Sequence, residues 1–576
     1  MVNTPTLRRK GFLQRWKGPS RKSARHPLWV PDPDRYMPAA TRTRWPTGNT
    51  ANPWLYGTGL AYQCSKLFFG SPDYPTNNFL ITFVGFALTE GGNAPQETQA
   101  PPNVLITFVG FALTEGGNAP QETQAPPNDT FIDEAYFIHP NGTEYPIDFL
   151  GNAAATVTTN TGVVHGTVTL PEDLPGWSVF GVKTFYHGVE GAARLGCYRI
   201  QRHRGEKFWG AADLASVKAL ATANAVSTAA LDPDTWYNTV GNATNSQQQA
   251  YGPSLICAKG WDGRPAPIVI GDSLIERQEI AASADERGNM GMIRRWLDKR
   301  DDTYGSYIPI VMGVPGAHNE YELGTNATKR WDMIDAIAVG WNNGKPIWTS
   351  ILDQGGRNDT HSTSSATWLS RKYQADTRVV TRYPDQTGKL VGMTILPTMA
   401  STSNVGFTTA GYGATAAQWN GVTGVLAAVN SAIKASSRFK AVLDAYTAYV
   451  SDVDPTKAAG GADMPLGNVV GHPGNQDGVT NWNTMVLPDT VPLGSTILFE
   501  YQPGLYARRT VDEIVSNNGD GTMTVRVHES FATIVQDNAA LYGAPFTASG
   551  LIHPALHAIL RFVSRFSQSG KLYLHV

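Results

Sequence analysis

Cysteine is scarce in this chain, and long apolar runs are absent. Only three cysteines, Cys64, Cys197 and Cys257, occur among 576 residues. An odd, widely spaced set argues against a disulfide framework, so these thiols are expected in the core. No stretch approaches the length of a membrane-spanning helix, and the net charge of −2 provides no general attraction to nucleic acid or anionic membranes.

Charged residues are also sparse, at 16% of the chain, whereas the hydrophobic content of 41% is that of a folded protein. A chain of this length exceeds what one hydrophobic core supports and should form about two to four domains. The sequence contains 58 glycines and 37 prolines. Because these residues mark turns, much β-structure is expected.

Residues 1–51 are expected to be a basic arm, which contains no acidic residue before Asp32. The arm lacks the apolar stretch of a secretory signal, so conventional export is not expected. Either the arm is merely solvated, or it attaches the protein to an acidic protein or nucleic-acid surface. Its basic residues are Arg8, Arg9, Lys10, Arg15, Lys17, Arg21, Lys22 and Arg25.

Residues 80–103 and 105–128 are the same 24-residue string, repeated at a period of 25. The sequence of each copy predicts one β-strand followed by a Gly-Asn-Ala-Pro loop. Two copies do not make a solenoid, which needs at least three stacked units. The identity therefore indicates a recent duplication or an assembly error. If the fold uses one such strand, the second copy must bulge out, add an edge strand or exchange with the first. An extra apolar edge strand would promote association.

The first half of the chain is rich in short strands. Strands separated by turn signals such as Asn141-Gly142 predict an antiparallel β-sandwich over residues 52–205, which either binds glycan or packs as a spacer. Residues 206–263 are expected to be a helical and polar connector.

An α/β domain is predicted over residues 264–484 and 546–576. A helical pattern over 417–434 alternates with apolar strands at 390–396 and 439–450, as a parallel sheet requires. The intervening residues 485–545 are expected to form a small inserted β-meander. Its position before the last helix would let it shape access to a site. The predicted strands of this insert are 495–501, 507–515 and 523–528.

A candidate nucleophile follows the first strand of the α/β domain. The apolar run Pro-Ile-Val-Ile at 267–270 is followed by Gly-Asp-Ser-Leu at 271–274. A short β-branched run that ends in glycine is typical of a buried strand, which would deliver Ser273 to the carboxyl edge of the sheet. The residues after it open a helix, whose N-terminus favours developing negative charge.

Further residues for serine chemistry follow in order along the chain. An apolar run ends at Gly316, another leads into Gly355-Gly356-Arg357-Asn358-Asp359, and His553-Pro554 lies near the C-terminus. Acyl transfer by serine needs a base and donors for the tetrahedral oxyanion. His553 is the candidate base. The candidate donors are the backbone N–H groups of Ser273 and Gly316 and the side-chain amide of Asn358.

These four blocks, in this order, resemble the SGNH or GDSL hydrolases, which are serine esterases and lipases on a flavodoxin-like, three-layer α/β sheet. The resemblance covers roughly residues 264–480 and the tail from about 545. It implies that Ser273 is the nucleophile, that Gly316 and Asn358 are oxyanion donors, that His553 is the general base, and that no cofactor is needed. The G-x-S-x-G elbow of ordinary α/β-hydrolases is not present around Ser273.

One position departs from that family pattern. The family usually places an aspartate three residues before the histidine, where it orients the imidazole. Here that residue is Gly550. Either a Ser-His dyad is oriented by a carbonyl or a distant acid, or the domain is inactive. The alternative acids are Asp463, Asp477 and Asp537.

The histidines His553 and His557 share the i, i+4 spacing of a helical zinc pair. No glutamate stands between them and no third ligand is evident, so no metal site is expected.

Together these features predict a serine esterase that removes O-acetyl groups from a polysaccharide. The β-module, the insert and the basic arm also resemble bacteriophage tail or tailspike components, which implies a virion or extracellular-surface location. Other virion proteins are the partners that the arm would contact, and a homo-oligomer is compatible with this role. The alternative is a non-catalytic structural or glycan-binding virion protein with a degenerate hydrolase domain.

Overall fold

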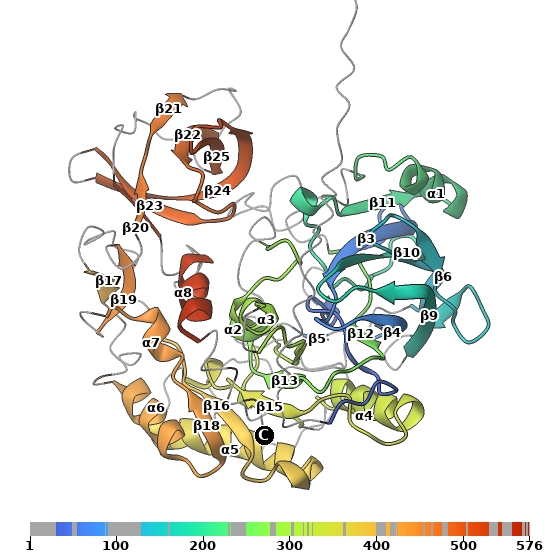
Figure 1. Cartoon of the computed structure of the whole chain (residues 1–576), viewed down its shortest axis with the longest axis horizontal. Coiled ribbons are helices and arrows are strands. Elements are labelled where there is room, and N and C mark those ends of the chain that lie inside the picture. Colours follow the sequence, from blue (N-terminus) through green and yellow to red (C-terminus); the bar gives the residue numbers. More distant parts are fainter. Residues whose placement is uncertain are drawn as a thin grey trace, which may run out of the picture.

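The computed structural model combines one parallel sheet with several antiparallel sheets (Figure 1). It describes residues 30–48, 55–86, 88–89, 128–158, 162–228, 231, 249–276, 284–300, 304–314, 316–319, 322–324, 327–360, 364–398, 410–414, 422, 424–452, 456–461, 465–474, 482–502, 505–528, 540–543, 556–566, 571 and 574.

Five parallel strands form the centre of the α/β domain. Their spatial order is β14-β13-β15-β16-β18, which is 2-1-3-4-5 in chain order. This is the order of flavodoxin-like doubly wound sheets. The strands are mainly apolar because both faces of the sheet are covered. They are β13 (Pro267–Ile270), β14 (Ile310–Val311), β15 (Ser350–Asp353), β16 (Leu390–Met393) and β18 (Phe439–Leu443).

Helices pack on both faces of this sheet, so the domain has three layers (Figure 1). Along β13, Ile268 and Ile270 belong to the apolar cluster on one face, and Val269 to the cluster on the other. This alternation follows from the two-residue period of a strand. The first face carries α4 (Lys329–Trp341), α5 (Ser365–Arg382) and α6 (Val425–Ala435). The second carries α2 (Ser273–Glu276), α3 (Met292–Asp298), α7 (Tyr446–Tyr449) and α8 (Leu556–Phe566).

The N-terminal half forms two antiparallel sheets that enclose an aromatic core. One sheet has the order β1-β12-β4-β9; the other has the order β11-β3-β10-β6-β7, with β8 paired to β6. Phe79, Phe137 and Phe180 meet between them, with ring centroids 4.7–5.5 Å apart. The strands are β1 (Met37–Pro38), β3 (Tyr62–Gly70), β4 (Thr76–Val84), β6 (Thr130–Ile138), β7 (Glu144–Pro146), β8 (Ala155–Val157), β9 (Val163–Leu174), β10 (Val179–His187), β11 (Lys207–Ala211) and β12 (Leu255–Ala258).

The sandwich extends beyond the predicted range of 52–205 at both ends. β1 comes from the range assigned to the basic arm, and β11 and β12 come from the predicted connector. β12 pairs with both β1 and β4. β1 and β12 have only two and four residues, which is too short to show a periodic hydrophobic pattern, and their partner strands lie far away in the sequence. The connector also contains α1 (Leu214–Thr222), which packs on the outer face of β3 and β11.

All three cysteines are buried and free, in agreement with the expectation of core thiols. The first copy of the duplicated string contributes residues 80–84 to β4, a central strand. Of the second copy, residues 105–127 lie outside the described residues.

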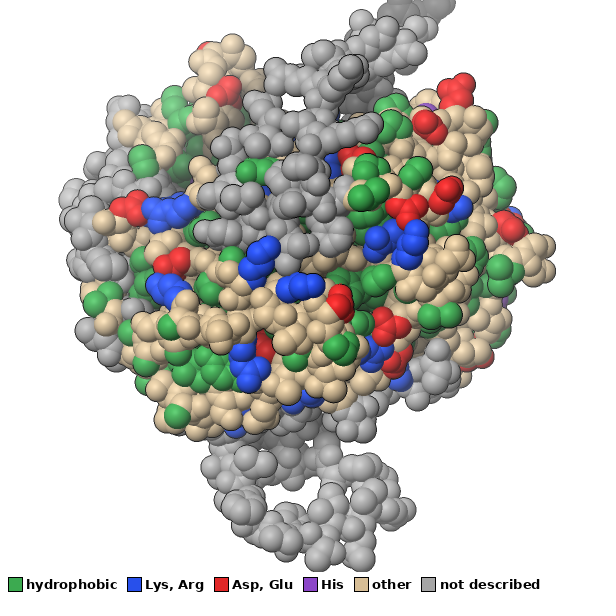
Figure 2. Space-filling model, turned by 60° about the horizontal axis from the view of Figure 1, so that its bottom comes forward, with side chains coloured by type: hydrophobic (Ala, Val, Ile, Leu, Met, Phe, Trp, Pro, Cys, Tyr) green, Lys and Arg blue, Asp and Glu red, His purple; other side chains and the backbone are tan. Residues whose placement is uncertain are grey.

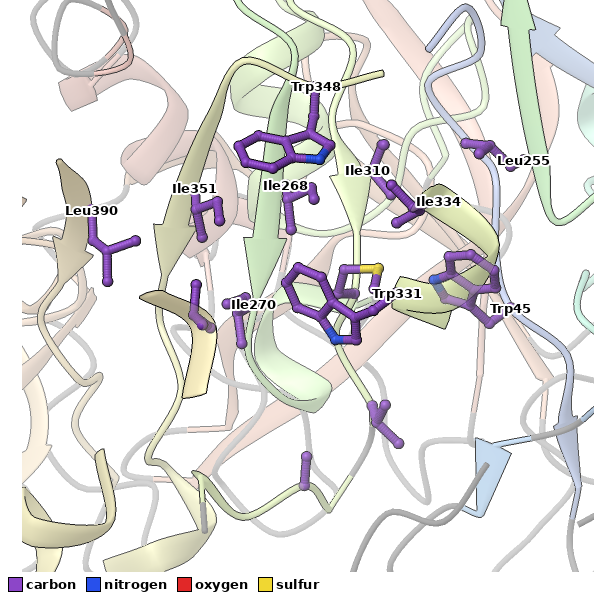
Figure 3. Packing of buried hydrophobic residues seen from close by; sticks show 14 of the residues in the cluster. Trp45, Leu255, Ile268, Ile270, Ile310, Trp331, Ile334, Trp348, Ile351 and Leu390 are labelled. Carbon is purple, nitrogen blue, oxygen red and sulfur yellow. The ribbon is translucent and has the colours of Figure 1, made fainter. Parts of the chain in front are cut away.

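The sandwich and the parallel sheet share a hydrophobic core. Leu80 of β4 and Leu255 of β12 belong to the same buried cluster as Trp331 and Ile334 of α4. Figure 3 shows Leu255 and Trp45 beside Ile334, next to the side chains of the parallel strands. Along β4, Leu80 and Val84 belong to this shared cluster, whereas the alternate residues Phe79, Ile81 and Phe83 belong to the sandwich cluster, so the strand is buried on both faces.

A seven-stranded antiparallel sheet with its own core lies between β19 and α8 in the sequence. It begins at residue 465, earlier than the predicted start at 485. Its early strands are rich in glycine and proline and give no alternating pattern. The strands are β20 (Pro465–Asn468), β21 (Gly471–Gly474), β22 (Trp482–Pro488), β23 (Thr496–Gln502), β24 (Leu505–Asn517), β25 (Thr522–His528) and β26 (Ala540–Gly543). Two small pairs complete the fold: β17 (Ala410–Ala414) with β19 (Lys457–Gly461), and β2 (Thr47–Gly48) with β5 (Leu88–Thr89).

Within the described residues, no helix combines the length and apolarity needed to span a bilayer. On the face shown in Figure 2, basic side chains lie among acidic ones rather than in a patch of one sign. Elsewhere in the fold, charges are also paired: Arg382 of α5 bonds both Asp332 and Asp335 of α4, at 2.8 and 2.6 Å.

Candidate active site

Ser273 is the first residue of α2 and directly follows the turn after β13. The N-cap of this short helix is Asp272, whose Oδ1 accepts a hydrogen bond from the backbone N–H of Leu274 at 2.9 Å. The backbone carbonyl of Asp272 accepts the first helical bond, from the N–H of Glu276 at 3.1 Å. Ser273 is 8% exposed. The sequence thus places a serine at the carboxyl edge of a buried strand, as predicted.

The loop after β14 lies against the turn that carries Ser273. The N–H of Val314 donates to the carbonyl of Gly271 at 3.2 Å. A Cβ on Gly313 would lie 2.8 Å from the carbonyl oxygen of Asp272, so only glycine allows this approach. Gly316, the predicted backbone donor, has a φ of +77°, a conformation that favours glycine.

The loop after β15 is bonded to the loop after β14. Asn358 Nδ2 donates to the carbonyl of Ala317 at 3.0 Å, and Asp359 Oδ2 accepts from the N–H of Asn319 at 2.9 Å. The N–H of Gln354 donates to the carbonyl of Ile270, which joins this loop to β13 as well. The three loops that carry Ser273, Gly316 and Asn358 are therefore held together by backbone and side-chain hydrogen bonds.

These three loops follow adjacent strands in the order β14-β13-β15. The chain moves from β13 to one side for β14 and to the other side for β15, so this is the topological switch point of the sheet. Crevices at the carboxyl ends of strands at a switch point are where open α/β sheets bind ligands.

Two buried groups of opposite charge, Asp272 and Arg357, are the sequence neighbours of Ser273 and Asn358. Burial raises the pKa of Asp272 to about 6, although the Leu274 N–H and the Arg357 guanidinium oppose that shift. Burial likewise lowers the pKa of Arg357 to about 9, opposed by the charge of Asp272. Arg357 Nη2 also donates to the hydroxyl of Thr398. The opposite charges of Asp272 and Arg357 thus favour each other's charged form across the Ser273 turn and the Asn358 loop.

A second buried charge cluster fixes the end of β15. Lys372 Nζ donates to Asp353 Oδ2 at 2.9 Å and to the carbonyl of Gly355 at 3.0 Å. Burial and the neighbouring Asp353 together raise the pKa of Asp376 well above its ordinary value. This cluster holds the strand end from which the Asn358 loop departs.

His318 was not singled out in the sequence, but it lies two residues beyond Gly316. Its Nδ1 is 3.6 Å from Oδ1 of Asp359, whose side chain is fully buried. Arg371 approaches the same carboxylate at 3.9 Å. The position of Asp359 in the Gly-Arg-Asn-Asp block was the only signal in the sequence for this contact.

The predicted base His553 lies outside the described residues, as do Gly550 and the alternative acids Asp463, Asp477 and Asp537. α8 begins at Leu556, three residues after His553. Ala558 and Ile559 of α8 share an apolar cluster with Leu274 and Ile275 of α2. Thus α8 and the Ser273 helix lie on the same face of the sheet.

His557 lies within α8 and is 8% exposed. Burial lowers its pKa to about 4, and its Nε2 has no hydrogen-bond partner among the described residues. Across the same residues, no group of three or more His, Cys, Asp or Glu side chains is arranged to hold a metal ion.

No protein-family model matches this chain, and no curated protein matches its sequence. Among solved structures, a carbohydrate acetylesterase from Xanthomonas citri shares 11% identity over 76% of this chain and 94% of its own, with a TM-score of 0.21. A family two carbohydrate esterase from Cellvibrio japonicus shares 10% identity over 75% of this chain and 91% of its own, with a TM-score of 0.22. Identities and TM-scores this low establish neither a common fold nor a common activity.

Proposed function

We propose that this protein is a serine esterase of the SGNH type that removes O-acetyl groups from a polysaccharide. The observation that carries the proposal is the convergence of the Ser273, Gly316 and Asn358 loops at the switch point of a 2-1-3-4-5 sheet. A serine and two kinds of hydrogen-bond donor at one sheet edge are, together with a base, the groups that acyl transfer needs.

In the proposed reaction, the Ser273 oxygen attacks the ester carbonyl carbon while His553 takes the hydroxyl proton. The carbonyl electron pair moves to oxygen. The N–H groups of Ser273 and Gly316 and the amide of Asn358 bind that oxyanion. Collapse of the intermediate breaks the bond to the sugar oxygen, which receives the proton from His553. Water then attacks acetyl-Ser273 with the same proton transfers and releases acetate.

A short acyl group is proposed because Ser273 is 8% exposed and lies between loops that are bonded to each other. The saccharide part of the substrate is proposed from the association of the α/β domain with β-rich modules. With Gly550 three residues before His553, the base acts in this proposal as part of a Ser-His dyad.

The test is hydrolysis of p-nitrophenyl acetate by the full chain and by Ser273→Ala. A matched control is Ser350→Ala, because Ser350 is fully buried at the amino end of β15 in the same sheet. Ser273→Ala should abolish hydrolysis with an almost unchanged melting temperature, and Ser350→Ala should retain activity. A Ser273→Ala protein with more than about a hundredth of the original activity would exclude Ser273 as nucleophile.

The substrate class is tested separately, by measuring acetate released from an O-acetylated polysaccharide and from its chemically deacetylated form. Release from the acetylated form alone supports the proposed substrate. A full chain that hydrolyses neither p-nitrophenyl acetate nor the polysaccharide would favour the non-catalytic alternative.

A further inference from the structure

A buried arginine outside the α/β domain contacts the helix that begins with Ser273. Arg44 lies between β1 and β3 in the sequence and is 4% exposed. Its Nη1 donates to the carbonyl of Cys197 at 2.8 Å, and its backbone N–H donates to Tyr198 Oη at 3.2 Å. Its Nε forms an ion pair with Oε1 of Glu276, the last residue of α2. Arg44 therefore bridges the sandwich and the nucleophile helix.

The same short segment holds the end of α2 by a second route. Arg294 of α3 donates from Nη1 to the carbonyl of Glu276 and from Nη2 to the carbonyl of Thr43 at 2.9 Å. Next to Arg44, Trp45 Nε1 donates to the carbonyl of Val311 in β14 at 2.9 Å. The end of α2 is thus held through both the Glu276 side chain and the Glu276 backbone.

The described part of α2, Ser273–Glu276, is one turn long and depends on such support. A single helical turn is not stable alone, since its few hydrogen bonds do not offset the loss of backbone entropy. Asp272 caps the N-terminal end, and the Arg44 and Arg294 contacts hold the C-terminal end. The position of Ser273, three residues before Glu276, depends on both ends.

We propose that Arg44 is a positioning residue for the nucleophile, acting through Glu276. This inference rests on the proposed function, in which Ser273 is the nucleophile. It means that a segment outside the α/β domain is required for full activity of that domain. The sandwich is then more than a spacer, because it supplies part of the support for the active serine.

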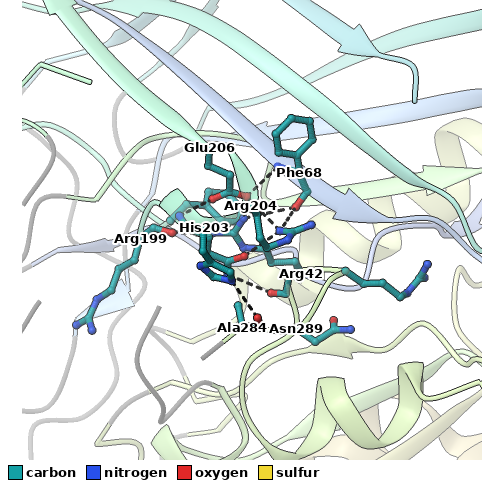
Figure 4. Close-up of polar contacts among 12 residues, drawn as sticks. Arg42, Phe68, Arg199, His203, Arg204, Glu206, Ala284 and Asn289 are labelled. Carbon is teal, nitrogen blue, oxygen red and sulfur yellow. Dashed lines mark hydrogen bonds and ion pairs between the residues drawn. The ribbon is translucent and has the colours of Figure 1, made fainter. Parts of the chain in front are cut away.

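The test compares Arg44→Gln with Arg42→Gln in the full chain. Arg42, two residues earlier, is 2% exposed and forms its own buried ion pair with Glu206. Its other hydrogen bonds go to the carbonyls of Phe68 and Arg199, and among the described residues none of its hydrogen-bond partners belongs to α2 (Figure 4). Both variants lose a buried ion pair, so a general loss of stability should appear in both.

Arg44→Gln should lower kcat by roughly ten- to a hundredfold with little change in KM, because small displacements of reacting groups have effects of this size. Arg42→Gln should keep the kcat of the parent protein. Arg44→Lys, which retains the charge, should recover part of the loss. The double variant Arg44→Gln, Glu276→Gln should be no slower than the slower single variant, since both remove one interaction.

Hydrogen exchange of the peptide covering residues 270–276 provides a readout that needs no activity. Exchange should become faster in Arg44→Gln and stay unchanged in Arg42→Gln. If Arg44→Gln does not fold, Glu276→Gln is expected to show the same faster exchange and lower kcat. The inference is overturned if the Arg44 or Glu276 variants have the same kcat as the parent protein and the same exchange rate in this peptide. If the parent protein is inactive but exchange is still faster in Arg44→Gln, the proposed function is contradicted. The stabilisation of α2 by Arg44 is then confirmed on its own.

Discussion

Asn358 and Ala317 are joined by a hydrogen bond of 3.0 Å from the side-chain amide nitrogen to the backbone carbonyl. An asparagine amide has two N–H groups, so this bond uses only one of them. In the proposed mechanism, the other N–H donates to the oxyanion. Asn358 therefore ties the Gly316 loop to its own loop and, in the proposed mechanism, donates to the substrate oxygen.

Asn358→Ala should lower kcat by on the order of a hundred- to a thousandfold with little change in KM, the size measured for single oxyanion-hole donors elsewhere. Steady-state kinetics with p-nitrophenyl acetate measure both constants. An effect confined to KM would show that Asn358 only contacts the substrate.

His557 should make the protein less stable in acid. Burial lowers its pKa to about 4, whereas an unfolded histidine has a pKa near 6.5. The unfolded chain therefore takes up the proton first, and the stability from this site is lost as pH falls from about 6.5 towards 4. Between pH 7 and pH 5 this amounts to about 2 kcal/mol.

Urea unfolding of the parent and of His557→Leu at pH 7 and pH 5 measures that difference. The free energy of unfolding of the parent should fall by about 2 kcal/mol more than that of the variant. Equal losses in the two proteins would mean that the folded protein does not hold His557 neutral.

Removing the second copy of the repeat should leave a folded protein. Deletion of residues 104–128 joins Asn103 to Asp129 and recreates the sequence that already precedes Asp129. It also keeps Phe79, whose ring packs against Phe137 at 4.7 Å. Deletion of residues 79–103 would instead put Val104 in place of Phe79, so it should be the less stable of the two.

Far-UV circular dichroism and size-exclusion chromatography of the 104–128 deletion check this. The spectrum should be preserved and aggregation reduced, because an extra apolar strand promotes association. An insoluble or unfolded deletion protein would show that both copies are integral to the sheet.

Local sequence patterns predicted the elements that carry the site. The apolar run at 267–270 is β13 with the same bounds, since four β-branched or apolar residues before Gly-Asp-Ser leave little alternative. The three blocks with Ser273, Gly316 and Asn358 follow adjacent strands, as parallel strands joined by crossovers require. Boundaries were less accurate. The strand predicted at 439–450 ends at Leu443, where α7 follows after a turn.

Long-range contacts were not predictable in this way. The pairing of β12 with β4 joins residues more than 170 positions apart, and Arg44 meets Glu276 across 232 positions. Neither pair leaves a periodic signal, because their contacts depend on how the sandwich packs on the parallel sheet. For the same reason, no local pattern predicted that β4 would pack on the α/β domain as well as inside the sandwich.

The most direct test of this account is the site of covalent labelling by a fluorophosphonate, which reacts with activated serines. We predict that one equivalent adds to the full chain, that peptide mapping places it on Ser273, and that esterase activity is lost in proportion. Ser350→Ala should be labelled like the parent protein. Absence of labelling, or labelling at a serine other than Ser273, would contradict the assignment of Ser273 as the nucleophile.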